Sequence, residues 1–153
     1  MRKETVVLGL GNPLMSDEGI GSFLIEKLLT KANDFPDVEF IDTGTGGMAM
    51  LHLIEDRKKA VLIDCAYMDT EPGTIMKFTP KQVQSVKKLM HYSLHEVDIL
   101  KVLDIASQLG NCPGEVVIFG IEPQTVKLNA ELSDTISAKV DHYITAITEE
   151  LSS

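Results

Sequence analysis

Three acidic side chains and one histidine are the residues of this chain whose types and positions best suit catalysis or metal binding. Glu18 follows a continuously apolar segment, and Asp64 lies at the end of another. Asp42 ends a short alternating segment, and His95 lies near the start of a helical pattern. Carboxylate oxygens with one imidazole suit a divalent transition metal, and imidazole favours nickel, zinc or iron over calcium. The spacing alone does not identify the metal.

The elements that would position these residues alternate between strand and helix patterns. Apolar runs and alternation predict strands at 5–10, 38–42, 60–66, 74–78 and 115–123. The last of these ranges includes the exit from the strand, where Pro123 stops any extension and Glu122 is expected to be exposed. The segment at 74–78 differs from the other strands. Its alternating pattern suggests a partly exposed edge strand, and the short turn before it predicts an antiparallel one. Helical spacing and caps predict helices at about 16–31, 48–55, 93–110 and 132–151, with Ser16 or Asp17 as the cap of the first. This order predicts a three-layer α/β/α sandwich in a single domain over residues 1–153.

The same order places the candidate residues at one end of the sheet. Ligands of open α/β sheets bind beyond the carboxyl ends of the strands, near the point where the strand order reverses. Glu18, Asp42, Asp64 and His95 all follow or end predicted strands or open a later helix. The four can therefore converge on one rim.

Each of these residues also has a structural explanation. Asp17 and Glu18 can stabilise the helix that follows them, because acids favour the positive end of the helix dipole. Asx hydrogen bonds that cap a loop explain Asp42 better than metal ligation does, and they can explain Asp64 as well. His95 can be a surface histidine, although the positive helix end disfavours imidazolium and so favours the neutral form that binds metals.

The other histidines are weaker candidates. If Ser93 caps the helix, His91 lies outside it and does not share a helix face with His95. His52 and His142 fall on predicted helix faces, and we expect both at the surface.

Charge and composition exclude several classes of function. The formal net charge of -9, from 14 Lys and Arg against 23 Asp and Glu, disfavours a nucleic-acid partner, because little basic surface is left to release phosphate counterions. Cys65 and Cys112 are too far apart for a Cys-x-x-Cys motif, and nothing resembles a secretory signal, so we expect a reduced, cytoplasmic protein. Cys65 should lie in the core, pointing away from Asp64. No apolar run approaches the roughly 20 residues of a membrane-spanning helix, so membrane insertion is not expected.

The glycine-rich stretch Gly9-Leu10-Gly11-Asn12-Pro13-Leu14 suggests a dinucleotide-binding loop. The third glycine of G-x-G-x-x-G would fall at position 14, which is leucine, so that motif is absent. The stretch also resembles the opening of the peptidyl-tRNA hydrolases. Their downstream Thr-Arg-His-Asn segment is missing here and the acidic charge suits tRNA poorly, so only a distant relation in fold is expected.

Five segments in order resemble those of the nickel-iron hydrogenase maturation endopeptidases. They are Gly9 to Gly21 (GLGNPLMSDEGIG), Asp42-Thr43-Gly44-Thr45, Ile63-Asp64-Cys65-Ala66, Ser93-Leu94-His95-Glu96 and Gly120-Ile121-Glu122-Pro123. Any one segment would be weak, whereas the ordered set covers most of the chain. Thr43 departs slightly from the glycine-rich pattern usual at the second segment.

The resemblance implies both a fold and an activity. The implied fold is a mostly parallel, mixed five-stranded sheet between helices, of the phosphorylase/hydrolase-like kind. The implied activity is that of an aspartyl-type endopeptidase, which removes the C-terminal extension of a hydrogenase large-subunit precursor after nickel insertion. Glu18, Asp64 and His95 match the family's metal-binding and catalytic positions. Nickel would arrive with the substrate as a check that the centre is complete, although other divalent metals can occupy the site in vitro.

Two functional hypotheses follow. The first is a monomeric, nickel-dependent protease whose partner is the large-subunit precursor, in which either the metal or a carboxylate activates water. The second is a metal-sensing or escort protein that binds the nickel-loaded precursor without cutting it. No Ser-His-Asp arrangement or reactive thiol is evident in the sequence, so the site itself does not separate the two hypotheses.

Overall fold

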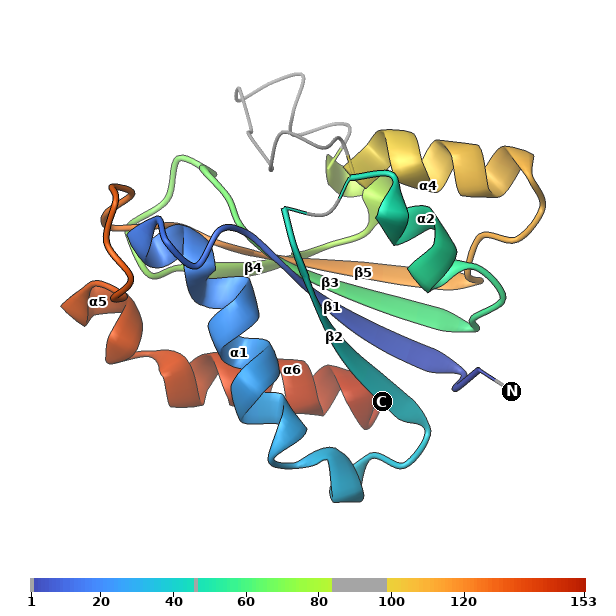
Figure 1. Cartoon of the computed structure of the whole chain (residues 1–153), viewed down its shortest axis with the longest axis horizontal. Helices are drawn as coiled ribbons and strands as arrows, with labels where there is room; N and C mark the ends of the chain where they lie inside the picture. Colours follow the sequence, from blue (N-terminus) through green and yellow to red (C-terminus); the bar gives the residue numbers. More distant parts are fainter. Residues whose placement is uncertain (1, 46, 84–98) are drawn as a thin grey trace.

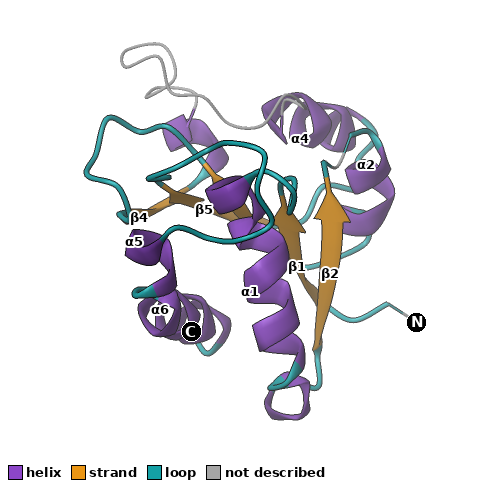
Figure 2. Ribbon diagram, turned by 60° about the vertical axis from the view of Figure 1, so that its left-hand side comes forward, coloured by secondary structure: helices purple, strands orange, loops and turns teal. Residues whose placement is uncertain are grey.

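The fold is built on a five-stranded sheet, as seen in a computed structural model that describes residues 2–45, 47–83 and 99–153. The strand order is β2-β1-β3-β5-β4, with β4 antiparallel to β5 and the other pairs parallel. The strands are β1 (Thr5–Leu10), β2 (Val38–Gly44), β3 (Lys59–Cys65), β4 (Ile75–Phe78) and β5 (Glu115–Ile121). Figure 2 shows β2 and β4 at opposite edges. The predicted mixed, mostly parallel sheet is confirmed.

Helices lie on both faces of this sheet. They are η1 (Ser16–Gly19), α1 (Ile20–Leu29), η2 (Ala32–Asp34), α2 (Ala49–Ile54), α4 (Ile99–Gln108), α5 (Asp134–Ser137) and α6 (Val140–Leu151). Figure 1 shows α1 and α6 on one face of the sheet and α2 and α4 on the other, which confirms the predicted three layers. Within the described ranges, no helix is both long and apolar enough to cross a membrane.

Strand alternation divides the core into two halves. In β3, Ala60 and Leu62 pack with the buried faces of α2 and α4, whereas Val61 and Ile63 pack with those of α1 and α6. Successive side chains of a strand point to opposite faces, so a continuously apolar strand can serve both cores. This explains why β1 and β3 are buried almost throughout.

The helix starts differ from the prediction in two places. The helix expected from residue 16 opens as the 3-10 turn η1, and α1 has Gly19 at its N-cap without a side-chain cap. The expected cap by Ser16 or Asp17 is therefore wrong. The last helix is divided into α5 and α6, and Ser133 caps α5 by accepting a hydrogen bond from Ile136 N at 3.4 Å. The predicted cap at Ser93 lies outside the described residues, which enter α4 at Ile99.

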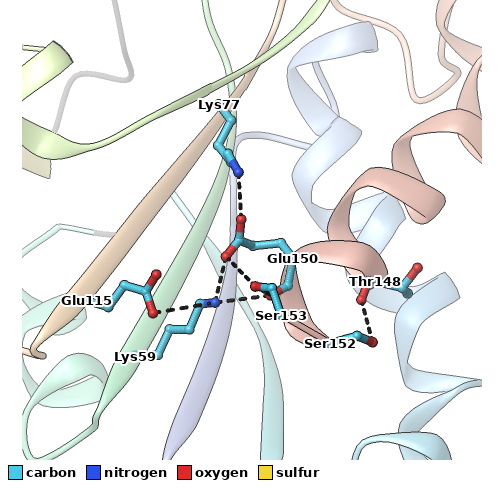
Figure 3. Close-up of polar contacts among 7 residues, drawn as sticks. All are labelled: Lys59, Lys77, Glu115, Thr148, Glu150, Ser152 and Ser153. Atoms are coloured by element: carbon cyan, nitrogen blue, oxygen red, sulfur yellow. Dashed lines mark hydrogen bonds and ion pairs between the residues drawn. The ribbon is translucent and has the colours of Figure 1, made fainter.

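A buried carboxylate ties α6 to the amino end of β3. Glu150 accepts hydrogen bonds from Lys59 Nζ at 2.6 Å and Lys77 Nζ at 3.0 Å (Figure 3). Burial acts to raise the pKa of Glu150, but the hydrogen bonds and charges of the two lysines outweigh it and lower the pKa below its ordinary value. Because Lys59 opens β3, this cluster lies at the opposite end of that strand from Asp64, and its role is structural.

Candidate active site

The strand order reverses at the seam between β1 and β3. From β1 the chain passes to β2 on one side and returns to β3 on the other, so β1 and β3 are adjacent. Open α/β sheets bind ligands in the crevice beyond the carboxyl ends of two such strands. Glu18 lies in η1, which follows β1, and Asp64 is the penultimate residue of β3. Two of the predicted site residues therefore come from the two strands that form the seam.

Two glycines let the start of α1 approach this seam. A Cβ added at Gly21 would lie 2.7 Å from Leu10 N and 2.9 Å from Ile63 O, and it would also overlap Leu10 O. A Cβ at Gly9 would meet the backbone oxygen of Gly21. Real Cβ atoms do not approach backbone atoms so closely, so the glycines are needed for packing. Because neither glycine has a side chain, α1 can begin close to the sheet, and η1, which carries Glu18, contacts β3.

The turn that carries Glu18 is fixed by local hydrogen bonds. Asn12 Oδ1 accepts from Leu14 N at 2.9 Å, and Glu18 N donates to Met15 O at 3.1 Å. Ser16 has φ +52°, a left-handed conformation that is costly for a residue with a side chain. The surrounding contacts hold Ser16 in that conformation, which sets where the chain presents Glu18.

Asp64 is fully buried at the end of β3. Its sequence neighbours at positions 62 and 66 pack in the core on the α2 and α4 side, so strand alternation directs Asp64 to that face. Cys65 packs in the core on the opposite face, as predicted. The Asp64 carboxylate can therefore act on a ligand beyond the end of β3, while the backbone of Asp64 remains in the sheet.

The end of β3 lies in an acidic environment. Burial is the main reason that the pKa of Cys65 is raised, and the negative charges of Asp64, Glu18, Asp17 and Glu122 raise it further. Asp64 precedes Cys65 in β3, and Glu18 lies in η1, which contacts β3. Both acids therefore lie at the β1 and β3 seam, and their joint action on a ligand stays a prediction from the sequence. Cys65 is correspondingly poor as a thiolate nucleophile.

The third predicted site residue, His95, lies outside the described residues, as does His91. Among residues 2–45, 47–83 and 99–153, no three His, Cys, Asp or Glu side chains form a group that could hold a metal. The described part of the rim supplies two carboxylates, to which a metal site would have to add a donor from elsewhere.

Asp17 anchors the segment that follows β5. Its side chain is buried and accepts from Gln124 N at 2.9 Å, Thr125 N at 2.8 Å, Ser133 N at 2.7 Å and Ser133 Oγ at 2.7 Å. Residues 124–133, which we call the strap, are thereby held against the loop before α1 (Figure 1). Sequence patterns carry no sign of this role, because the partners are more than 100 positions away.

The comparisons with known proteins agree on one family. A family model described as hydrogenase maturation protease matches residues 23–150. A relative from Methanocaldococcus jannaschii, named for hydrogenase maturation protease activity, is 32% identical over 98% of this chain and 97% of its own length. The chain belongs to the hydrogenase maturation proteases. It is therefore a peptidase, which favours the first of the two functional hypotheses.

Solved structures show that the protease has the fold of this family. The hydrogenase maturating endopeptidase HybD from E. coli superposes with a TM-score of 0.81 at 24% identity, over 99% of this chain and 93% of that one. The hydrogenase 2 maturation peptidase from Thaumarchaeota archaeon SCGC_AB-539-E09 superposes with a TM-score of 0.72 at 29% identity, over 97% and 98% of the two chains.

Asp42 has a local structural role in the protease. It is exposed at the end of β2, where its Oδ1 accepts from Gly44 N at 3.0 Å and from Ser22 Oγ at 2.8 Å. The first contact is the Asx hydrogen bond that the sequence favoured over metal ligation. The second ties the end of β2 to α1, beside the seam.

Glu122 corrects a second expectation. Predicted to be exposed after β5, it is buried and accepts from Met68 N at 2.6 Å and Thr70 Oγ1 at 3.0 Å. The carboxylate thus shapes the loop that follows β3. The pair Glu122-Pro123 predicted the end of the strand, but it did not predict that the Glu122 side chain turns inward.

His52 and His142 lie at the surface, as predicted. His52 is exposed and its Nδ1 lies 3.7 Å from Glu55 Oε1 within α2. His142 is exposed on α6, with its ring centroid 6.2 Å from that of Tyr143.

Proposed function

We propose that this protease removes the C-terminal extension of a nickel-iron hydrogenase large-subunit precursor, and that it acts on precursor that already holds nickel. The observation that supports the proposal best is the arrival of Glu18 and Asp64 from the two strands that form the seam. Family membership supplies the peptidase activity. The carboxylate and imidazole donors expected at the rim support the requirement for nickel.

The donor set suits a metal that the substrate carries. Two carboxylates with the imidazole of His95 would give oxygen and nitrogen ligands of the kind that divalent transition metals accept. Such a set leaves coordination positions for ligands of the substrate itself. Nickel bound by both proteins would hold the precursor in one orientation, so that a precursor without nickel would be aligned poorly.

Hydrolysis in this arrangement needs little else from the protein. A water oxygen adds to the scissile carbonyl carbon, the C–N bond breaks, and the proton from water passes to the leaving amine. Either nickel held by the substrate or one of the two carboxylates would activate that water. The raised pKa of the buried Cys65 thiol argues against a covalent cysteine mechanism.

Substitution of the proposed site residues tests this proposal. Glu18→Gln, Asp64→Asn and His95→Ala should each slow cleavage of the nickel-loaded precursor by more than roughly 100-fold, because loss of even an outer-shell partner costs 10–100-fold. Asp42→Asn is the matched control, since this acid ends β2 and has local partners. Circular dichroism checks that each variant is folded. Cleavage by folded Glu18→Gln and Asp64→Asn proteins at the wild-type rate would contradict the proposal.

A further inference from the structure

Three exposed apolar side chains lie in the segments that follow β1, β3 and β5. Leu14, in the loop after β1, is 59% exposed, and Leu128, in the strap, is 82% exposed. Tyr67, just beyond β3, is 52% exposed. Single exposed apolar residues are ordinary on protein surfaces, whereas adjacent ones mark interaction sites. Their placement relative to one another therefore decides whether they form a single surface.

Backbone contacts place Leu14 beside Leu128. Met15 and Asn129 form a parallel bridge, and Asn129 N donates to Leu14 O at 2.9 Å. The residues that precede the bridge on the two segments, Leu14 and Leu128, are therefore neighbours in register. Two leucines that are more than half exposed thus lie on adjacent segments beside the turn that carries Glu18.

Tyr67 follows the other strand of the seam. It lies two residues beyond β3, which contacts η1, and half of its side chain remains in solvent. Burial is the main cause that raises the pKa of its phenol, and the charges of Cys65, Glu18 and Glu122 add to it. We call Leu14, Tyr67 and Leu128 the apolar rim.

The strap presents Leu128 in a fixed position. Ser16 N donates to Asn129 O at 2.7 Å, and Ser16 Oγ donates to Lys127 O at 2.9 Å, so the residues on both sides of Leu128 are held. Asp17 holds the two ends of the strap. A leucine held in solvent by its neighbours gains nothing for folding, because burial of its side chain is what would stabilise the fold.

The charge around the apolar rim indicates the kind of partner. The segments 11–19, 42–45, 64–74 and 122–134 hold nine acidic residues and one basic residue, Lys127. Three of these acids are buried, and Lys139 lies against Gly73, but acids that are not buried still outnumber these two lysines. Such a surface attracts cations and repels acidic chains. A partner segment with apolar side chains beside lysine or arginine would match both properties.

We infer that the apolar rim of Leu14, Tyr67 and Leu128 is the docking surface for the polypeptide substrate, and that it receives an apolar segment flanked by basic residues. This inference rests on the proposed function, because the docked segment belongs to the precursor cut at Glu18 and Asp64. The rim fixes the register of the chain, and the acids act on it beside that surface. Recognition and cleavage then reside in different residues of the same edge.

Kinetics with the nickel-loaded precursor test the inference. Leu128→Ser and Leu14→Ser should each raise KM on the order of tenfold, as expected for loss of one well-buried leucine contact, and leave kcat within about twofold. Leu109→Ser is the matched control, because Leu109 is 63% exposed but follows α4, at the opposite end of the sheet. It should leave KM unchanged. Sodium chloride should raise KM for the wild type and the leucine variants alike, because it screens the acidic surface.

The other outcomes are distinguishable. Unchanged KM in both rim variants, with an active wild-type enzyme, would overturn the docking surface and leave the proposed function standing. No cleavage by the wild type would overturn both. Sedimentation of the free protein identifies a second copy as the occupant: if Leu128→Ser dissociates an oligomer without changing KM, the surface is a self-association site and the inference is wrong.

Discussion

Removal of the Asp17 carboxylate should release the strap and destabilise the whole protein. In Asp17→Ala, the N–H groups of Gln124, Thr125 and Ser133 lose their acceptor, as does the Ser133 hydroxyl. All of these contacts link segments more than 100 positions apart. The expected effect is therefore on global stability as well as on the loop that carries Glu18.

The size of the effect follows from opposing contributions. A hydrogen bond to a charged group contributes about 1.5–3 kcal/mol. The four bonds to Asp17 are not additive, because they share one carboxylate, and burial of that carboxylate itself costs several kcal/mol. We expect Asp17→Ala to lower the free energy of unfolding by about 3 kcal/mol, which is roughly 6–12 °C in Tm for a chain of this size.

Asp17→Asn should fall between alanine and the wild type. Oδ2 accepts three hydrogen bonds and Oδ1 accepts the fourth, so an amide oxygen can replace the first atom while its NH₂ group faces Ser133 N. Two donors then oppose each other, and about 2 kcal/mol should be lost.

Thermal unfolding followed by circular dichroism measures both substitutions. Asp134→Ala, at an exposed acid one residue beyond the strap, is the control and should change Tm by less than about 2 °C. An Asp17→Ala protein as stable as this control would refute the anchoring role. Such a result would also mean that Asp17 does not hold Leu128 in its fixed position.

Three further predictions concern other parts of the fold. Glu150→Gln should destabilise the protein at neutral pH, and urea titrations should show the difference from wild type shrinking as the pH falls. The folded-state pKa of Glu150 is lowered, so its contribution is complete above the ordinary glutamate pKa and is lost as the pH falls through the lowered value. Gly21→Ala should lower Tm by several degrees, whereas Gly114→Ala, whose added Cβ would lie 3.7 Å from Lys58 O, should not. Thiol labelling of the folded protein should modify Cys112 before Cys65, since Cys65 is buried and its pKa is raised further by surrounding acids; equal rates would contradict this.

The arrangement of strands and helices was predictable because its causes are local. The apolar run at 5–10 and that at 60–66 indicate strands buried on both faces, and the structure places them at the centre as β1 and β3. The short turn before 75–78 indicates the antiparallel β4. Glu18 and Asp64 could be placed at one rim because parallel strands end together.

Long-range polar contacts were not predictable in the same way. Asp17 has the sequence context of an acid at the start of a helix, and only the fold brings the strap to its carboxylate. Glu122 has the context of an acid that leaves the sheet beside a proline, yet its side chain turns inward to Met68 N. In both cases the partner lies far along the chain, and a single buried carboxylate has no periodic signal. The placement of His95 remains a prediction from sequence.

Cleavage of matched precursors tests the proposed nickel requirement most directly. The large-subunit precursor from the same genome would be prepared with and without nickel, incubated with the wild-type protease, and analysed by mass spectrometry for loss of its C-terminal extension. Glu18→Gln protein would serve as the inactive control. We expect only the nickel-loaded precursor to be shortened. Equal shortening of both precursors would contradict nickel-gated cleavage.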